Sequence, residues 1–249
     1  MSPLPLCCTS SYIIQSNTKS SRITILDQNL TKKIKIDQSY FALSSRSPTF
    51  VQKMSNPAFM SVCIIGDRRQ MRSLYGKMLR LQNRKKPLVE NGFYYPQRWL
   101  GNLVTRLGAD WHDVNCRGTW DYLKLDRKSL YFFTESAWHA PFEVLQLIQK
   151  VYPGLEIYFS AVGDGWDFYL TNDKEGRFFK NRFELDMPPE NDYYDTIEEV
   201  AERIGAYIGR HIEPTKEAVY AAIDEFDETN DDMDAYINLK EFEVCDDLI

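Results

Sequence analysis

The sequence predicts an α+β fold in which helices cover one face of an antiparallel sheet. Two observations predict it. Short β-prone runs of alternating hydrophobicity lie between stretches with helical periodicity, and pairs of these runs are separated by connectors of hairpin length. The chain of 249 residues is 43% hydrophobic, so it can bury a core without disulfides or metal ions.

The first β-α unit is predicted to begin at Phe59. A β-prone run from Phe59 to Ile65 ends at Gly66, and Asp67 is suited to cap the helix that follows. Apolar residues recur along one face of this helix, namely Met71, Leu74, Tyr75, Met78 and Leu79. A second helix is expected after a polar connector, opened by Pro96 and closed by Gly108.

Hairpins and helices are predicted to alternate through the rest of the domain. The expected elements are strands over 119–125 and 129–135, a helix from Pro141 to Tyr152, a strand over 155–162, a second hairpin of 166–170 and 177–185, and a helix that begins near Thr196 with Glu199 as its capping-box partner. This order contains the split β-α-β arrangement of ferredoxin-like folds, in which helices lie over one face of an antiparallel sheet.

Charge is distributed very unevenly, although the net charge is only -6. Residues 1–90 carry 15 basic and 4 acidic side chains, whereas residues 187–249 carry 4 basic and 19 acidic ones. Such asymmetry bears on partners rather than on fold. Composition, charge and the order of elements predict three segments: a poorly ordered or non-native leader over 1–53, a ferredoxin-like domain over 54–211, and an acidic helical tail over 212–249.

Several kinds of protein are excluded by what the sequence lacks. No apolar run reaches the ~20 residues of a membrane-spanning helix, so no membrane partner is expected. The five cysteines are odd in number and lack C-x-x-C spacing, which argues against disulfides, structural zinc and iron–sulfur clusters. The sequence therefore favours a reducing cytoplasm and predicts no cofactor.

Catalysis is not predicted, because none of the common nucleophile, nucleotide-binding or metalloprotease motifs occurs. One alternative stays open. The segment Trp111-His112-Asp113 and the more distant His139 would place a general base beside a carboxylate if the chain folded them into one cleft. Cys116 has no neighbour in the sequence that would activate its thiol.

Three segments around the first hairpin and its following helix carry a distinctive pattern. They read RGTWD at Arg117–Asp121, FTESAWHAP at Phe133–Pro141 and VYPGL at Val151–Leu155. These segments resemble GTKWD, F-x-TAWSPP and F-P in the YubB/Api92-like ferredoxin-domain family, whose members are encoded largely on bacterial plasmids, phages and integrative elements. The resemblance covers about residues 54–185 and implies a ferredoxin-like accessory protein of a mobile genetic element, with no assigned activity.

The residues of this pattern are predicted to be structural. They are Gly118, Thr119, Trp120, Asp121, Ala137, Trp138 and Pro141. Trp120 and Trp138 are expected to pack where the sheet meets the helices, because large aromatic side chains in such places usually belong to the core. Pro141 is expected to fix the entry of the helix.

The acidic tail contains a pattern typical of calcium-binding loops. Oxygen-bearing side chains stand at loop positions 1, 3, 5, 9 and 12, namely Asn230, Asp232, Asp234, Asn238 and Glu241. One helix would enter this loop and another, with Phe242 and Leu248 on its apolar face, would leave it. Because Ala235 stands where the sharp turn requires Gly, two interpretations stay open: a calcium loop, or a solvated acidic tail with some helix.

The sequence as a whole favours a non-enzymatic accessory protein that contacts a protein partner through its sheet or its acidic C-terminal part. Three alternatives remain. The acidic part mimics nucleic-acid charge and blocks a DNA-binding or defence protein, the basic stretch from Arg68 to Lys86 binds nucleic acid directly, or the tail binds calcium. Direct nucleic-acid binding is the weaker expectation, because a run of charges along a helix is usually a solvated face.

Overall fold

A computed structural model describes residues 56–90, 97–163, 168–232, 234–245 and 248–249. The predicted leader over 1–53 and the predicted helix start at Pro96 lie outside these ranges. Within them the elements are β1 (Pro57–Gly66), α2 (Arg68–Gln82), α3 (Leu100–Leu107), β2 (Gly118–Leu125), β3 (Leu130–Ala137), α4 (Phe142–Val151), β4 (Leu155–Gly163), β5 (Tyr169–Thr171), β6 (Phe183–Met187), β7 (Glu190–Tyr194), α5 (Ile197–Ile208), α6 (Lys216–Thr229), β8 (Asn238–Glu241) and β9 (Glu243–Val244). The prediction of an α+β fold is confirmed.

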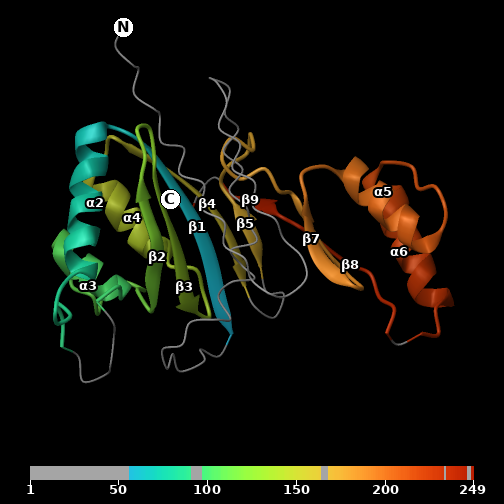
Figure 1. Ribbon diagram of the computed structural model, residues 1–249, viewed down its shortest axis with the longest axis horizontal. Coiled ribbons are helices and arrows are strands. Elements are labelled where there is room, and N and C mark those ends of the chain that lie inside the picture. Colours follow the sequence, from blue (N-terminus) through green and yellow to red (C-terminus); the bar gives the residue numbers. More distant parts are fainter. Residues whose placement is uncertain (1–55, 91–96, 164–167, 233, 246–247) are drawn as a thin grey trace, which may run out of the picture.

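The first lobe is built on a six-stranded sheet with the order β2-β3-β1-β4-β5-β9. Every neighbouring pair is antiparallel except β5 and β9, which run parallel. Helices α2, α3 and α4 lie together on one face of this sheet (Figure 1). Alternate residues of β1 point toward them, and Met60, Val62 and Ile64 are buried in the core of this lobe.

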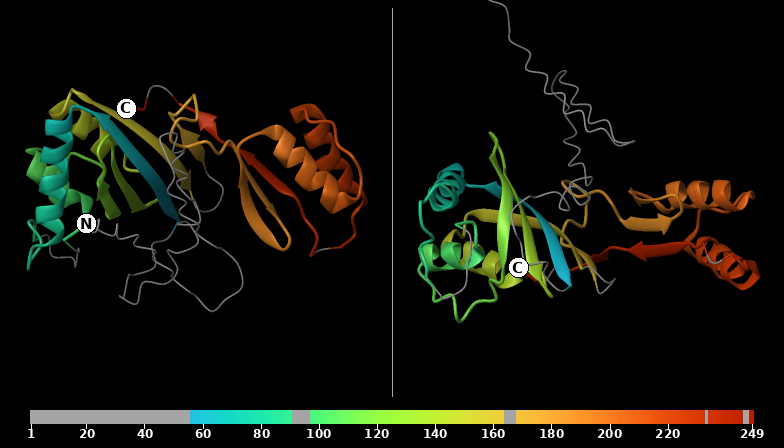
Figure 2. Two further views of the ribbon diagram at one scale, coloured as in Figure 1. Left: turned by 45° about the horizontal axis from the view of Figure 1, so that its top comes forward. Right: turned by 60° about the horizontal axis from the view of Figure 1, so that its bottom comes forward.

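The second lobe has its own sheet and its own core. Its strands follow the order β7-β6-β8, and α5 and α6 pack on one face of them. Leu185, Val200, Ile204 and Val219 belong to a hydrophobic cluster separate from that of the first lobe. The two helices lie at the end of the molecule opposite α2 (Figures 1 and 2). The predicted boundary at residue 211 falls between two helices that share this cluster.

The chain enters the second lobe after β5 and returns to the first lobe at β9, so the second lobe is an insertion in the first. The two crossing segments meet where the amide of Phe242 donates to the carbonyl of Arg182, at 2.8 Å. Beyond this point Cys245 N donates to Thr171 O at 2.8 Å, and the Gln146 side chain of α4 donates to Leu248 O at 3.1 Å. The end of the acidic segment is therefore bound to the first lobe.

A buried carboxylate shapes the segment that leaves β5. Asp173 is 1% exposed, and its oxygens accept the backbone N–H groups of Arg177, Phe178 and Phe179 at 3.0, 2.6 and 2.7 Å. The guanidinium of Arg182 then donates to the carbonyls of Asp173 and Phe179, at 2.6 and 3.0 Å. These bonds satisfy backbone groups that no strand pairs, and they fix the path of the chain into β6.

Two predicted elements are corrected by the structure. The second hairpin is wrong, because β5 pairs with β4 and β9 while β6 pairs with β7 and β8 in the other sheet. The Asp173 loop redirects the chain where a tight turn was expected. The helix expected to leave the calcium loop around Phe242 is also wrong, since this segment forms β8 and β9, each of which completes a sheet.

The helix caps follow the local sequence closely. Asp67 accepts a bond from Gln70 N at 2.8 Å, Thr196 accepts one from Glu199 N at 3.4 Å, and Gly108 ends α3 in the left-handed conformation. The Glu199 carboxylate reaches back to Asp195 N at 3.0 Å. Among the described helices, none is long and apolar enough to cross a membrane.

Replacing residues 183–241 by a short glycine-containing turn is expected to leave the first lobe folded. The ends of this insertion already meet through the bond between Phe242 N and Arg182 O, and the two lobes have separate cores. Cooperative thermal unfolding monitored by circular dichroism measures the outcome. A matched deletion of 183–249 also removes β9 and is expected to be less stable, because it uncovers the edge of β5. Loss of cooperative unfolding in the first variant would contradict the modular arrangement.

Candidate functional site

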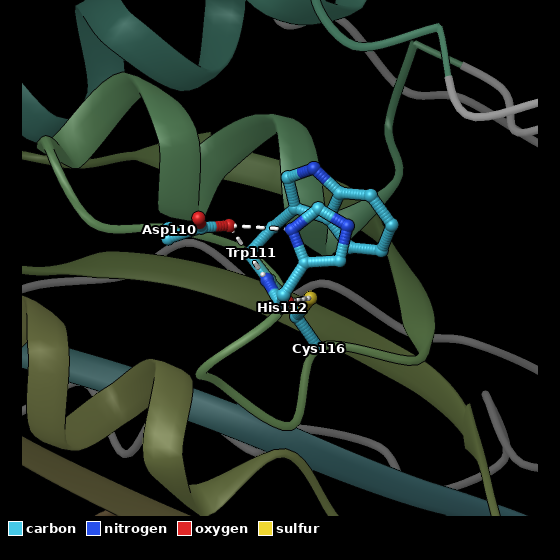
Figure 3. Close-up of polar contacts among 4 residues, drawn as sticks. All are labelled: Asp110, Trp111, His112 and Cys116. Carbon is cyan, nitrogen blue, oxygen red and sulfur yellow. Dashed lines mark hydrogen bonds and ion pairs between the residues drawn. The ribbon is translucent and has the colours of Figure 1, made fainter.

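A carboxylate–imidazole pair lies in the loop that follows α3 (Figure 3). Asp110 Oδ1 accepts the backbone N–H of His112 at 3.0 Å and lies 2.7 Å from His112 Nδ1. The His112 ring stacks on Trp111 with centroids 3.7 Å apart, and Trp111 meets Trp99 edge-on at 5.1 Å. A bond from Asn115 N to the Glu143 carboxylate, 2.7 Å long, ties this loop to α4.

The chemistry of this pair is that of a positioned imidazole. An ionised carboxylate can only accept, so Nδ1 carries a proton toward Asp110, and in the neutral ring Nε2 is left as the acceptor. The bonds from the His112 backbone and ring lower the pKa of Asp110. However, the side chains of His112 and Asp110 are 64% and 59% exposed, so water surrounds both groups. Fixed charges act most strongly where water is excluded, and this pair is open to solvent.

The groups that sequence reasoning placed together do not all meet. No hydrogen bond or ion pair within the described residues joins His139 or Asp113 to His112. The carboxylate that does bind His112 is Asp110, which the sequence analysis did not single out. The sequence could have indicated this pair through an Asx turn, in which an Asp side chain accepts the N–H group two residues further on. Asp110 and His112 have that spacing.

Cys116 lies near the end of the same loop but is not an activated nucleophile. Its side chain is 4% exposed, and Sγ donates to the carbonyl of Trp111 at 3.5 Å. Burial, with a smaller contribution from the Glu143 carboxylate, raises the pKa of Cys116 to about 11. The thiol is therefore protonated at neutral pH.

Cys116 is expected to react with iodoacetamide more slowly than Cys245 at neutral pH. The thiolate is the reacting species, and the raised pKa leaves little thiolate until the pH approaches 11. Peptide-resolved mass spectrometry after timed alkylation measures both rates in one sample. In denaturant the two cysteines should react alike. Rapid alkylation of Cys116 in the folded protein would show that its thiol is activated after all.

The two tryptophans of the sequence pattern have different environments. Trp120 in β2 is fully buried in the core of the first lobe, as expected. Trp138 is 47% exposed, so the prediction that it packs in the core is wrong. The physical reason is the turn after β3, where Trp138 adopts a φ of +72° and donates its backbone N–H to Asn56 O at 2.8 Å. This conformation ends the alternation of the strand and turns the side chain outward.

The other residues of the pattern support the hairpin and the next helix. Thr119 pairs with Trp99 in an isolated bridge, and Asp121 forms an ion pair with Arg98. Ala137 ends β3, and Pro141 immediately precedes α4. A Cβ atom at Gly118 would lie 2.4 Å from Glu135 O and 2.7 Å from the Ser136 side chain, so the close approach of β2 and β3 requires glycine there.

Gly118→Ala is expected to lower the free energy of unfolding by about 1–3 kcal/mol, because the added methyl group would push β2 away from β3. Denaturant unfolding measures the change. Gly76→Ala in α2 is the matched control: its Cβ would meet no atom closer than 3.4 Å, and alanine should stabilise the helix by about 0.5–1 kcal/mol. If both variants gain stability, the close approach at Gly118 does not limit the fold.

The loop proposed for calcium is organised by its own hydrogen bonds. The Asn230 side-chain amide donates to the carbonyls of Asp232 and Ala235 at 3.0 and 2.8 Å, and Asp232 Oδ1 accepts from Asp234 N at 3.0 Å. Asn238 begins β8, and Glu241 in that strand forms an ion pair with Lys216. A strand therefore occupies the last third of the proposed loop, where an EF-hand requires a ligand at the start of a helix. Within the described part of the chain, no group of three His, Cys, Asp or Glu side chains is placed to hold a metal ion.

The solvent faces of α5 and α6 carry a dense group of carboxylates, called here the acidic helical surface. Its residues are exposed and form no ion pair within the described ranges: Glu198, Glu202, Glu217, Asp224, Asp227 and Glu228. Cations compensate only part of the charge nearby, since Arg210 pairs with Glu225 at 2.5 Å and Lys216 pairs with Glu241. Part of the acidic excess of the sequence is thus displayed on the two helices of the second lobe.

Comparisons with protein-family models, with curated proteins and with solved structures found no match to this chain. The resemblance of its sequence pattern to the YubB/Api92-like family therefore stays a prediction.

Proposed function

We propose that this protein is a non-enzymatic interaction protein that binds a basic protein partner through the acidic helical surface. The observation that carries the proposal is the density of exposed, uncompensated carboxylates on α5 and α6. Folding brings these like charges together on one layer, where their mutual repulsion opposes the compact state. A cationic partner would relieve that repulsion and would be steered to this end of the molecule by its field.

The sharper form of this proposal is a mimic of nucleic-acid charge. The buried faces of α5 and α6 pack against the second sheet, so the helix positions that carry these carboxylates keep a constant spacing. A protein that binds DNA mainly through phosphate contacts would meet a comparable array of negative charge here. Such binding should weaken steeply as salt is added, because the interaction is largely electrostatic.

The sheet of the first lobe offers less to a partner. On the face opposite the helices, Phe59 and Phe133 stack with centroids 6.0 Å apart, and Tyr122 packs edge-on against Phe133 at 6.3 Å. Phe133 is buried, which leaves Tyr122 as the strongly exposed ring of this group. Scattered single aromatics on a surface are common and do not by themselves indicate an interface.

We also propose that the first lobe has the ferredoxin-like fold. It is supported by the order β2-β3-β1-β4, by the antiparallel pairing of these four strands, and by helices on one face only. The sequence pattern around Trp120 supports the further proposal that the chain is an accessory protein of a mobile genetic element.

Binding to a labelled, basic, sequence-independent DNA-binding protein tests the function. We expect saturable binding at low salt, competition by duplex DNA, and a roughly tenfold or larger loss of affinity in the triple variant Asp224→Lys, Asp227→Lys, Glu228→Lys. These residues are exposed on α6, so the fold should be unaffected. Fluorescence anisotropy at increasing salt gives both the affinity and its salt dependence.

The matched control makes the same change in charge on the first lobe. Glu90→Lys, Asp113→Lys, Glu156→Lys replaces three exposed carboxylates there and is expected to bind almost as the unaltered protein does. Equal losses in the two triple variants would mean that only net charge matters, and the acidic helical surface would lose its role. Absence of binding at low salt would refute the proposed function.

A further inference from the structure

A surface depression of about 340 Å³ lies at the start of α2, beside the turn between β2 and β3. Its lining residues are Arg68, Arg72, Leu125, Asp126 and Arg127, called here the arginine pocket. Arg68 and Arg72 are one helical turn apart, so they share a face of α2, and Arg127 reaches the same space from the turn after β2. Two segments far apart in the sequence thus bring three arginines to one surface depression.

The three arginines of the pocket are exposed. Within the described residues, no carboxylate forms an ion pair with Arg68, Arg72 or Arg127. The acidic residue of the pocket, Asp126, is engaged by Lys124, whose Nζ lies 3.1 Å from its carboxylate. Adjacent like charges repel one another. An anion bound among the three arginines would relieve that repulsion and be attracted by each of them.

The backbone adds to the same field. Arg68 is the first residue of α2, which spans 15 residues, so the positive end of the helix dipole lies at the pocket. Asp67 caps this end by accepting from Gln70 N at 2.8 Å. Because the Asp67 carboxylate already occupies this helix end, the arginine side chains supply most of the attraction for a phosphate.

Guanidinium groups bind a phosphate group better than a simple halide ion. Their planar, forked N–H donors match pairs of phosphate oxygens and hold them in fixed geometry. Leu125 provides an apolar wall, and a cavity of about 340 Å³ is at the lower end of the range for small-molecule sites. The space therefore suits a phosphate group with part of the molecule that bears it.

We propose that the arginine pocket is a binding site for a phosphate group, carried either by a small phosphorylated molecule or by the backbone of a nucleic acid. The site is independent of the acidic helical surface, since the two lie at opposite ends of the molecule (Figure 1). Phosphate binding at one end and contact with a basic protein at the other would let this protein engage two ligands of opposite charge.

Two probes test the site on the full chain. Inorganic pyrophosphate, followed by isothermal titration calorimetry, represents a small phosphorylated ligand. A fluorescent single-stranded oligonucleotide, followed by anisotropy, represents a phosphodiester backbone. We expect at least one probe to bind, and the triple variant Arg68→Gln, Arg72→Gln, Arg127→Gln to bind it at least about tenfold more weakly.

Two further variants separate the pocket from general charge. Arg80→Gln, Arg106→Gln, Arg117→Gln removes three exposed arginines outside the pocket and should keep most of the affinity. Arg127→Lys keeps the charge but loses the forked donors, so an intermediate loss is expected. Circular dichroism checks that all variants are folded.

The outcomes decide the proposal and its ligand. Pocket-dependent binding of pyrophosphate alone identifies a small phosphorylated molecule, and pocket-dependent binding of the oligonucleotide identifies the nucleic-acid backbone. Failure of both probes to bind, or equal losses in the pocket and control triple variants, overturns the phosphate site. Neither result depends on the test of the acidic helical surface, because the substitutions lie in different lobes.

Discussion

The carboxylate of Asp173 is the interaction on which the two-lobed architecture depends. A buried charge is costly unless it is well bonded, and here three consecutive backbone N–H groups bond it. The loop that results presents its carbonyls to Arg182, which fixes where the chain enters β6. Since Arg182 O is also the acceptor for Phe242 N, the same loop sets where the chain comes back. Both crossings between the lobes are thereby positioned by one side chain.

Features encoded locally could be predicted from the sequence, and features that depend on distant partners could not. The caps at Asp67 and Thr196 and the first hairpin rest on neighbours within a few residues. In contrast, β7 is a run of acidic and aromatic residues without apolar alternation, and it is a strand because β6 provides its hydrogen bonds. Likewise the sequence of β8 and β9 is typical of an acidic tail, and these segments are strands because β6 and β5 pair with them. Composition described the charge of this segment correctly but not its backbone.

The candidate sites show the same division. Trp120 and Trp138 are alike in sequence context, yet a positive φ at one residue places one ring in the core and the other in solvent. Asp110, rather than the neighbouring Asp113, binds His112 because the turn folds the chain back by two residues. The arginine pocket needs both α2 and the turn after β2, and only the helical part of it was visible as a basic stretch. The sequence shows which side chains are present at every position, whereas only the tertiary fold shows which of them lie together.

The parallel pairing of β5 with β9 has a consequence for biosynthesis. β5 is completed at Thr171 and its partner begins only at Glu243, so the whole second lobe is translated between them. During that interval β5 presents an open edge with unpaired backbone groups, which is the kind of surface that other chains can pair with. The nascent protein is therefore most vulnerable to misassembly until β9 has left the ribosome. Slow pairing of such distant segments makes chaperone access and translation rate relevant to how much of this protein reaches its native state.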